Sequence, residues 1–344
     1  MKPGDLLNIL FVTDTWRPHI NGVVRSLEQT ILELERLGHH TKVIGPRDFH
    51  TLTVPRYPEL DLVFPGVRKR RMRVAIGDFT PDHIHIATEG FLGMSARRYA
   101  RYYNIPVSTA YHTQIPMYLR KYFYIPQPIS YGILRRFHNP KHRPHSVMVS
   151  TNTMKQQLES KGFKDIMIRP LGFDASVFYP RPRHPRPRPV LLFAGRVAIE
   201  KNVKAFLALD RLGLYDLVVV GDGPKRKEYQ ADFPRVSFLG MRVGDELAEV
   251  YSDADVLVFP SLTDTFGMVI IEAMACGTPV AAFPAPGPID IIEEGRNGSV
   301  HSSLAKAVEG ALSVDREQTA NIALLKYSWQ ESTRQFMEAV HHVR

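Results

Sequence analysis

Short apolar runs alternate with helical patterns along almost the whole chain, and this alternation restricts the fold more than any other feature of the sequence. Residues 6–13 form a continuous apolar run, residues 23–37 carry apolar side chains at helical spacing, and residues 41–46 form a second run. A strand, a helix and a strand in this order predict a parallel pair joined by a right-handed crossover. Further predicted strands of the first half cover residues 83–88, 107–112 and 146–151.

The second half of the chain repeats this rhythm more clearly. Its predicted strands cover residues 190–195, 216–221, 236–240, 255–260 and 279–283, and its predicted helices 202–210, 224–232, 244–253 and 266–276. The sequence therefore predicts an α/β fold with two doubly wound, Rossmann-like domains, each built on a parallel sheet and facing a cleft. Ligands of such domains bind at the carboxyl ends of the strands, so functional residues are expected on the loops that follow strands.

A proline-rich segment separates the two halves. Residues 179–190 alternate proline with arginine or histidine, which predicts a stiff, extended spacer with few hydrogen bonds; a basic docking segment is the alternative. We place a first domain at 1–170, the linker at 171–189 and a second domain at 190–326. The remaining residues, 327–344, end in an amphipathic helical pattern.

Composition indicates an ordinary globular protein. The chain has 344 residues, of which 44% are hydrophobic and 23% charged, so each half can bury its own core. The single cysteine, Cys276, excludes an intramolecular disulfide and a cysteine-rich zinc site, and favours a reducing compartment. The apolar run 6–12 is too short to span a bilayer and is not a signal peptide. We therefore expect a cytoplasmic protein.

The charge is divided unevenly between the halves. The net charge is +9, but residues 1–189 contain 29 Lys or Arg against 14 Asp or Glu, whereas residues 190–344 contain 15 against 21. A basic half favours a polyanionic partner, such as a nucleic acid, an anionic membrane or phosphorylated ligands. An arginine-rich surface without any such partner is the alternative.

The strongest motif is PSLTDTFGMVIIEAMACGTPV at residues 260–280, where a strand ends and a helix begins at Phe266 and Gly267. Backbone N–H groups at the start of a helix bind anions, and the helix dipole adds to this. Asp264, just before the helix, can contact sugar hydroxyls. Glu272 lies on a mostly apolar helix, where a carboxylate is costly unless it is hydrogen-bonded, either by a ribose diol or by a buried arginine.

Two further loops of the second half follow predicted strands. FAGRVAIEKN at residues 193–202 contains Arg196 and Lys201, and two fixed cations suit a diphosphate. On their own these residues are a weak signal, because loop cations are usually solvated. The turn VGDGP, with Asp222 and Gly223, is a candidate contact for a nucleotide base.

In the first half, Gly22 begins the first predicted helix directly after the first strand, which is a phosphate-loop position. The three-glycine dinucleotide fingerprint and the P-loop lysine are missing, which disfavours a nicotinamide enzyme or an ATPase. His112 ends a predicted strand, and it has either a structural role or a contact with a donor sugar.

Together these motifs resemble glycosyltransferase family 4, a family of retaining enzymes with the GT-B fold. The resemblance covers nearly the whole chain, and its specific parts are FAGRVAIEKN, VGDGP, TDTFGMVIIEAMACGTPV and the late EEGRNG. The family pattern is two glutamates separated by seven residues. Here Asp264 replaces the first glutamate, so its carboxylate is one methylene shorter, and Glu272 matches the second.

The resemblance implies a role for each of the loop residues. The diphosphate of a nucleotide-sugar donor would be bound by Arg196 and Lys201 and its ribose by Glu272, while the last helix would cross back to the first domain. The residues that we predict to act in catalysis are His112, Arg196, Lys201 and Asp264. Those that we predict to bind the donor are Gly22, Asp222, Gly223, Thr265, Phe266, Gly267 and Glu272.

The predicted mechanism follows from charge. Negative charge grows on the diphosphate as the glycosidic bond breaks, and loss of one preorganised group that stabilises it costs about 3–4 kcal/mol. No acidic cluster of the metal-binding type is recognised in the sequence, so we expect no metal and no cofactor, the nucleotide-sugar being a substrate. The resemblance implies retention of configuration, with the departing phosphate accepting the proton of the acceptor. A uridine donor is favoured over a guanosine donor.

The acceptor is expected to bind the basic first half. Residues 67–74 carry five cations, and the segments 95–104 and 116–145 mix Arg or Lys with Tyr, Phe, Ile and Leu, a composition that suits an anionic membrane surface. The residues predicted to contact the membrane or acceptor are Arg68, Lys69, Arg70, Arg71, Arg73, Arg120, Lys121, Arg135 and Arg136. We therefore expect a peripheral enzyme on the inner face of the cytoplasmic membrane that glycosylates a lipid such as diacylglycerol, similar to bacterial glycolipid-forming members.

Other functions remain as alternatives. A mannosyl- or hexosyltransferase acting on a polysaccharide or a lipid-linked oligosaccharide fits the same motifs. A nucleotide-sugar epimerase or a phosphorylase shares the fold, although an epimerase needs acid/base carboxylates in the cleft, and no clear pair apart from Asp264 and Glu272 is recognised in the sequence. Nucleic-acid binding is disfavoured, because no helix-turn-helix, zinc-finger or RNP pattern is recognised.

Overall fold

The computed structural model divides into two compact units, each described here by itself. Unit 1 comprises Met1–Pro170 and Ser332–Arg344, and unit 2 comprises Leu171–Glu331. The residues that the structure describes are 6–18, 22–49, 51–54, 57–63, 69–111, 116, 120, 124–139, 145–184, 186–262, 264 and 266–343, with the backbone alone at 51–54, 57–63 and 69.

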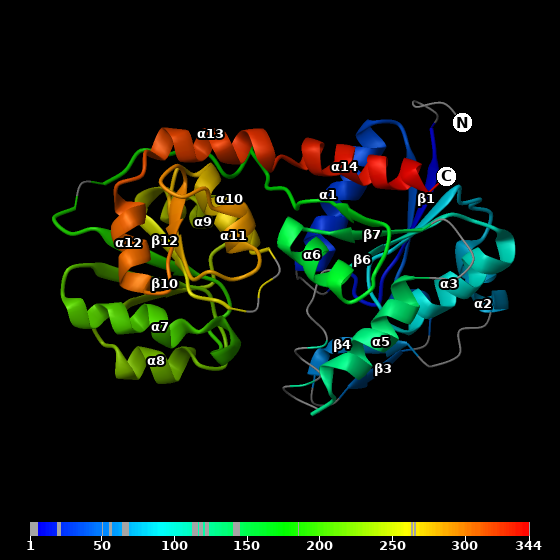
Figure 1. Ribbon diagram of the computed structural model, residues 1–344, viewed down its shortest axis with the longest axis horizontal. Coiled ribbons are helices and arrows are strands. Elements are labelled where there is room, and N and C mark those ends of the chain that lie inside the picture. Colours follow the sequence, from blue (N-terminus) through cyan, green and yellow to red (C-terminus); the bar gives the residue numbers. More distant parts are fainter. Residues whose placement is uncertain are drawn as a thin grey trace. The chain divides into compact units, whose positions relative to one another are not determined.

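Unit 1 is a parallel sheet with helices on both faces (Figure 1). Its strands are β1 (Asn8–Val12), β2 (His40–Ile44), β5 (His83–Ile86), β6 (Val107–Ala110), β7 (His145–Val149) and β8 (Ile166–Ile168), in the order β2-β1-β5-β6-β7-β8. Its helices are α1 (Gly22–Arg36), η1 (Pro46–Asp48), α2 (Lys69–Ile76), α3 (Phe91–Tyr103), α5 (Gln127–His138) and α6 (Asn152–Ser160). The order reverses between β1 and β5, so the loops after these two strands meet at a topological switch point.

The chain returns to unit 1 through its last helix, α14 (Trp329–His342). The helix lies beside α1 and β1 in Figure 1, and its residues Phe336 and Val340 are fully buried in one core cluster with Phe11 and Leu34. Ser146 Oγ donates a hydrogen bond of 3.2 Å to the carbonyl of Ala339. The apolar face of the helix therefore closes one side of the unit 1 sheet.

Unit 2 is a second parallel sheet of six described strands. They are β9 (Val190–Ala194), β10 (Asp216–Val220), β11 (Ser237–Gly240), β12 (Val256–Phe259), β13 (Val280–Ala282) and β14 (Gly298–Val300), in the order β11-β10-β9-β12-β13-β14. The helices are η2 (Ile199–Lys201), α7 (Val203–Leu207), η3 (Ala208–Leu212), α8 (Arg226–Asp232), α9 (Gly244–Asp253), α10 (Met268–Ala275), α11 (Pro288–Ile291), α12 (Leu304–Leu312) and α13 (Arg316–Lys326). Numbered along the unit, the strand order is 3-2-1-4-5-6, the order of dinucleotide-binding domains.

Continuous burial explains why the apolar runs became central strands. Every residue of β9, β12 and β13 is buried, because helices cover both faces of the sheet. One core cluster lies beneath α9, α10 and α13, and a second lies beneath α7 and α12. The predicted fold class, two doubly wound parallel-sheet domains, is thus confirmed.

The proline- and arginine-rich segment is well anchored, so the prediction that it makes few hydrogen bonds is wrong. Arg181 lies within 2.5 Å of the Asp245 carboxylate and also approaches Glu249, and Arg183 pairs with Asp255. Proline spacing leaves these side chains facing the acidic surface of unit 2, where ion pairs replace a backbone ladder.

Several elements were not predicted. An antiparallel pair, β3 (Thr51–Val54) with β4 (Tyr57–Val63), lies between η1 and α2, and the short strands β8 and β14 complete the two sheets. The basic run at 67–74 overlaps α2. Among the described helices, none has both the length and the apolar character needed to cross a membrane.

Candidate active site

The carboxyl ends of β9 and β12 lie side by side in the middle of the unit 2 sheet. Val256 of β12 pairs with Leu191 of β9, although 61 residues lie between the end of β9 and the start of β12. They are the strands between which the order along the sheet reverses, and ligands of open α/β sheets bind outside this point. The loop after β9 carries Arg196 and Lys201, and the loop after β12 carries Asp264.

Two polar contacts join these loops. Lys201 Nζ lies 2.5 Å from Asp264 Oδ1, and Asn202 Nδ2 donates a hydrogen bond of 3.1 Å to the carbonyl of Pro260. The other carboxylate oxygen, Asp264 Oδ2, is buried and has no hydrogen-bond partner among the described residues. Two residues predicted to act in catalysis therefore form one ion pair, which leaves an acceptor atom available.

The loop after β10 packs against the loop that carries Arg196. Val197 N donates a hydrogen bond of 2.9 Å to the carbonyl of Asp222, and a Cβ atom at Gly223 would lie 2.4 Å from the carbonyl of Val197. Only glycine permits this approach. The hydrogen bond from Gly223 N to the Asp222 carboxylate lowers the pKa of that group. Arg196 itself is exposed and forms no ion pair with a described residue.

The helix α10 begins with a glycine in a left-handed conformation. Gly267 has φ of 91°, and a Cβ atom there would lie 2.9 Å from the ring of Phe259. Phe266, the residue before it, is buried. The first N–H groups of α10 therefore follow directly on the loop of Asp264, in the arrangement that favours an anion.

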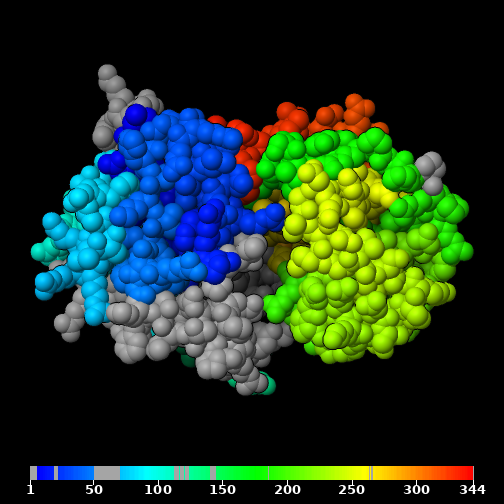
Figure 2. Space-filling view, turned by 180° about the vertical axis from the view of Figure 1, so that it is seen from behind, coloured from blue at the N-terminus to red at the C-terminus, as the bar shows by residue number. Residues whose placement is uncertain are grey.

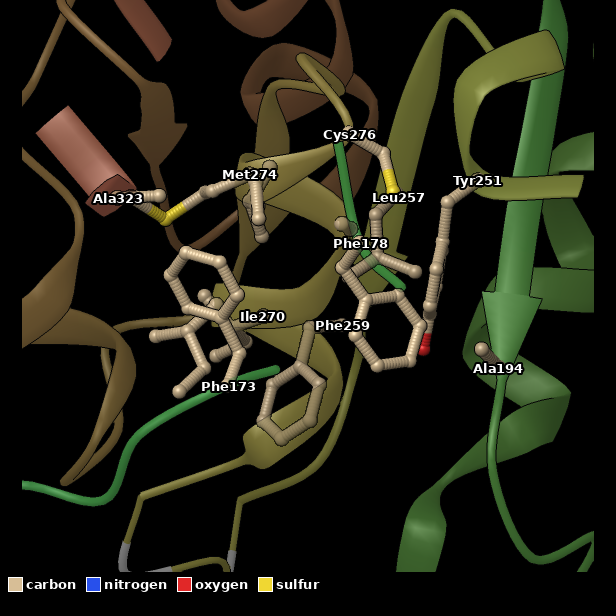
Figure 3. Packing of buried hydrophobic residues seen from close by; sticks show 14 of the residues in the cluster. Phe173, Phe178, Ala194, Tyr251, Leu257, Phe259, Ile270, Met274, Cys276 and Ala323 are labelled. Carbon is tan, nitrogen blue, oxygen red and sulfur yellow. The ribbon is translucent and has the colours of Figure 1, made fainter. Parts of the chain in front are cut away.

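Glu272 is buried inside unit 2, with 3% of its surface exposed. The Tyr251 hydroxyl of α9 donates a hydrogen bond of 3.1 Å to Glu272 Oε2, so a tyrosine is one partner of this buried carboxylate. The Tyr251 ring is packed against Phe178, with ring centroids 6.0 Å apart (Figure 3). A ribose contact at Glu272 remains a prediction.

In unit 1, the switch point holds an aspartate that the sequence analysis missed. Asp14, two residues after β1, accepts hydrogen bonds from Thr88 Oγ1 at 2.8 Å and from Leu92 N at 2.9 Å. Burial raises the pKa of its carboxyl, and its hydrogen bonds oppose this. The position after the first strand was the available signal. Asp14 joins the loop before α1 to the start of α3, and Gly22 is the first residue of α1.

A second polar cluster of unit 1 also escaped prediction. His138 is fully buried, and its Nε2 lies 3.3 Å from Glu89 Oε1 while its Nδ1 lies 2.8 Å from Thr109 Oγ1. Glu89 follows β5 by three residues, so the cluster reaches the carboxyl edge of the sheet.

Other predicted residues are distributed over unit 1 or lie outside the description. His112, Thr265, Arg68 and Lys121 lie outside the described residues, and the side chain of Lys69 is not described. Arg70, Arg71 and Arg73 lie on α2, whose atoms are at the surface with those of α3 (cyan in Figure 2), whereas Arg135 and Arg136 lie on α5. Arg120 is exposed. Within the described residues, no group of three or more His, Cys, Asp or Glu could hold a metal ion.

Comparisons with known proteins identify the family. A family described as "Glycosyltransferase Family 4" matches residues 20–177, and one described as "Glycosyl transferases group 1" matches residues 188–313. The chain is 31% identical to a GDP-mannose-dependent alpha-mannosyltransferase of Mycobacterium tuberculosis, over 85% of this chain and 83% of the relative. It is 26% identical to an alpha-monoglucosyldiacylglycerol synthase of Streptococcus pneumoniae, over 97% and 85%.

The fold is also found in solved structures. A sucrose-phosphate synthase from Thermosynechococcus elongatus matches with a TM-score of 0.78 and 19% identity, over 97% of this chain and 98% of that one. The two parallel sheets, the strand orders and these matches agree, and the chain belongs to glycosyltransferase family 4, is a glycosyltransferase and has the GT-B fold.

Proposed function

We propose that this enzyme transfers a hexosyl group from a nucleotide-diphosphate sugar to a lipid acceptor, with retention of configuration and without a metal ion. The observation that carries the donor half is the Lys201–Asp264 pair, held between the loops after β9 and β12 beside the start of α10. The pair offers a cation for the diphosphate and, for a sugar hydroxyl, a carboxylate oxygen that has no hydrogen-bond partner in the described part of the chain.

The reaction breaks the bond between the anomeric carbon and the diphosphate oxygen, and forms a bond from that carbon to the acceptor oxygen. The leaving diphosphate gains negative charge, which Arg196, Lys201 and the first N–H groups of α10 stabilise. The proton of the acceptor hydroxyl passes to the departing phosphate. Asp264 orients Lys201 and accepts a hydrogen bond from the sugar, so it does not act as a nucleophile.

The choice of donor is refined by the relatives. Three of them are named GDP-mannose-dependent alpha-mannosyltransferases, at 28–31% identity over 85% of this chain. This support favours GDP-mannose as the first donor to test, ahead of the UDP-sugar that the sequence analysis favoured. The exposed turn at Asp222 is our candidate contact for the base.

The lipid acceptor is supported by names and by charge. One relative is named an alpha-monoglucosyldiacylglycerol synthase. Unit 1 contains 27 Lys or Arg against 14 Asp or Glu, which suits an anionic membrane surface. A saccharide or lipid-linked oligosaccharide acceptor is the alternative, and we assign the enzyme to the membrane surface.

A ligand panel tests the donor site. GDP, UDP, GDP-mannose and UDP-glucose are added to the protein, and the ligand-induced rise in Tm is measured. At a fixed ligand concentration Glu272→Ala should sharply reduce the rise, because loss of a charge-assisted bond to the ribose, worth about 1.5–3 kcal/mol, weakens binding roughly 10- to 160-fold. The matched control is Tyr251→Phe, which removes the hydroxyl bonded to Glu272 and should lower the Tm but keep the ligand-induced rise. A full rise in Glu272→Ala would show that Glu272 is only structural.

A transfer assay tests the acceptor and the stereochemistry. The preferred donor is incubated with diacylglycerol in vesicles or with a soluble oligosaccharide, with and without EDTA. We expect an alpha-linked glycolipid, identified by NMR, and an unchanged rate in EDTA. A product formed only on the oligosaccharide would overturn the lipid acceptor, and epimerised donor in the absence of any acceptor would overturn transfer itself.

A further inference from the structure

A groove with a volume of about 920 Å³ lies in unit 1 between α3 and α5, apart from the residues assigned above to the donor. Its apolar floor includes Leu134 and Phe137, and Phe137 also packs against the core beneath α3. Arg97 joins the two helices, since its guanidinium lies 5.0 Å from the centre of the Phe137 ring. The groove is therefore part of a packed unit, with fixed walls.

Five arginines line this groove. They are Arg97, Arg98 and Arg101 on α3, and Arg135 and Arg136 on α5. None of them forms an ion pair with a described Asp or Glu. Burial without a carboxylate lowers the pKa of Arg97 to about 10. Guanidinium groups gathered in this way repel one another, and a bound anion would offset the repulsion.

Acidic side chains are scarce along the sequence that forms most of the groove. Residues 90–158 contain ten Lys or Arg and no Asp or Glu. Of the described residues that line the groove, Glu89 is the acidic one, and its carboxylate already lies against His138 at 3.3 Å. The described lining of the groove therefore offers no other carboxylate to pair with the arginines.

Exposed apolar side chains also lie at or near the groove. Ile133, which lines the groove, is 64% exposed, Ile129 is 56% exposed one turn before it on α5, and Met94 on α3 is 37% exposed. A soluble phosphate would leave these side chains in water, whereas an acyl chain or the membrane interface would cover them. Charge and apolar surface together favour a lipid over a soluble anion.

We propose that the α3–α5 groove binds the phosphate headgroup of an anionic membrane phospholipid, which anchors unit 1 to the bilayer and is not itself the glycosyl acceptor. The inference deepens the proposed function, because it names the lipid that holds the enzyme beside its acceptor. Arg98, Arg101, Arg135 and Arg136 grip the phosphate, and Ile129 and Ile133 enter the acyl region.

Gly132 supplies a variant that fills the groove. It lines the groove, and a Cβ atom built on it meets nothing within 4 Å, so a longer side chain fits without strain. Gly132→Glu places a carboxylate among the arginines, and it also raises helix propensity. Gln156→Glu on α6 is the matched control, since it adds the same charge at an exposed site outside the groove.

The test is flotation of the full chain with vesicles of phosphatidylcholine, with or without about 30 mol% phosphatidylglycerol as the anionic lipid. Wild type should bind only the anionic vesicles. Arg135→Gln/Arg136→Gln should weaken binding roughly 25-fold, at about fivefold per arginine. Gly132→Glu should weaken it at least about fivefold and Gln156→Glu less than about twofold.

The outcomes separate this inference from the proposed function. If Gly132→Glu binds anionic vesicles as wild type does, the groove is not the lipid site. If soluble glycerophosphoglycerol binds as tightly as the vesicles, the ligand is a soluble phosphate and the lipid is wrong. If wild type binds no vesicle, both the groove and the membrane assignment fall, while the nucleotide-induced rise in Tm still tests the donor site independently.

Discussion

At the scale of single residues, the Lys201–Asp264 pair carries the strongest prediction about catalysis. Lys201→Met should lower kcat by about 10²- to 10³-fold, because a preorganised group that stabilises the leaving diphosphate is lost. Lys204→Met is the control: Lys204 is exposed, and its ammonium lies 5.6 Å from the centre of the Tyr229 ring. Steady-state rates of both variants check this, and a loss below tenfold in Lys201→Met would exclude that role.

Some residues of the candidate site could be predicted from the sequence and others could not. Arg196, Lys201 and Asp264 were predictable, because each lies a few residues after a recognisable strand. The Tyr251 partner of Glu272 was not, since 21 residues separate them and only helix packing brings them together. The position of Asp14 just after the first strand could have marked it as a candidate site residue. A short polar side chain at such a position has many roles, however, so the position alone did not indicate one.

At the scale of elements, the largest side chain that the last helix α14 buries in the core of unit 1 is Phe336. The Phe336 ring is fully buried, with its centre 5.7 Å from that of Phe11 and 5.6 Å from the Arg169 guanidinium. Phe336→Ala should lower the free energy of unfolding by about 3–5 kcal/mol, through lost contacts and a cavity. Urea denaturation followed by circular dichroism measures this.

A matched control for that prediction lies on the same helix. Arg334 pairs with Glu338 one turn later, and both side chains are more than half exposed. Arg334→Ala should therefore cost no more than about 0.5 kcal/mol. Equal losses in the two variants would mean that α14 is held by its surface charges, contrary to its burial pattern.

The elements themselves were largely predictable, but their arrangement was not. The apolar runs marked most strands, because strands buried on both faces must be continuously apolar. The order of strands in a sheet depends on crossover connections, which have no signature in the local sequence. That β9 and β12 are neighbours could therefore be learned only from the structure. The β3–β4 pair was missed because prolines at 55 and 58 interrupt its pattern.

At the scale of the whole molecule, charge follows the division into units. Unit 1 carries a net charge of +13 and unit 2 of −4, so the basic excess lies in the unit that holds the α3–α5 groove. The cations of unit 2 near the proposed donor site are few and local, as Lys201 and Arg196 illustrate. A phosphate-bearing donor and an anionic bilayer should therefore act on different units, and their effects on stability should be separable.

The single cysteine makes this separation measurable. Cys276 is buried in unit 2, and burial raises the pKa of its thiol to about 12, so at pH 8 the folded protein holds it protonated and unreactive. Unfolding returns the pKa to its ordinary value of 9.0, and the thiolate that forms reacts. Labelling by a thiol reagent should therefore report the opening of unit 2.

We expect a nucleotide at about 100 times its Kd to slow that labelling about 100-fold, because binding stabilises only the closed form. Anionic vesicles, which we propose to bind unit 1, should leave the rate unchanged within about twofold if the units open independently. The labelling rate in urea gives the limit for a fully exposed thiol. The labelling rate without vesicles and without nucleotide is the baseline. Vesicles that slowed the labelling of Cys276 as strongly as the nucleotide does would contradict independent opening. Cys276 lies in unit 2, so a membrane bound to unit 1 can slow its labelling only if the two units open together.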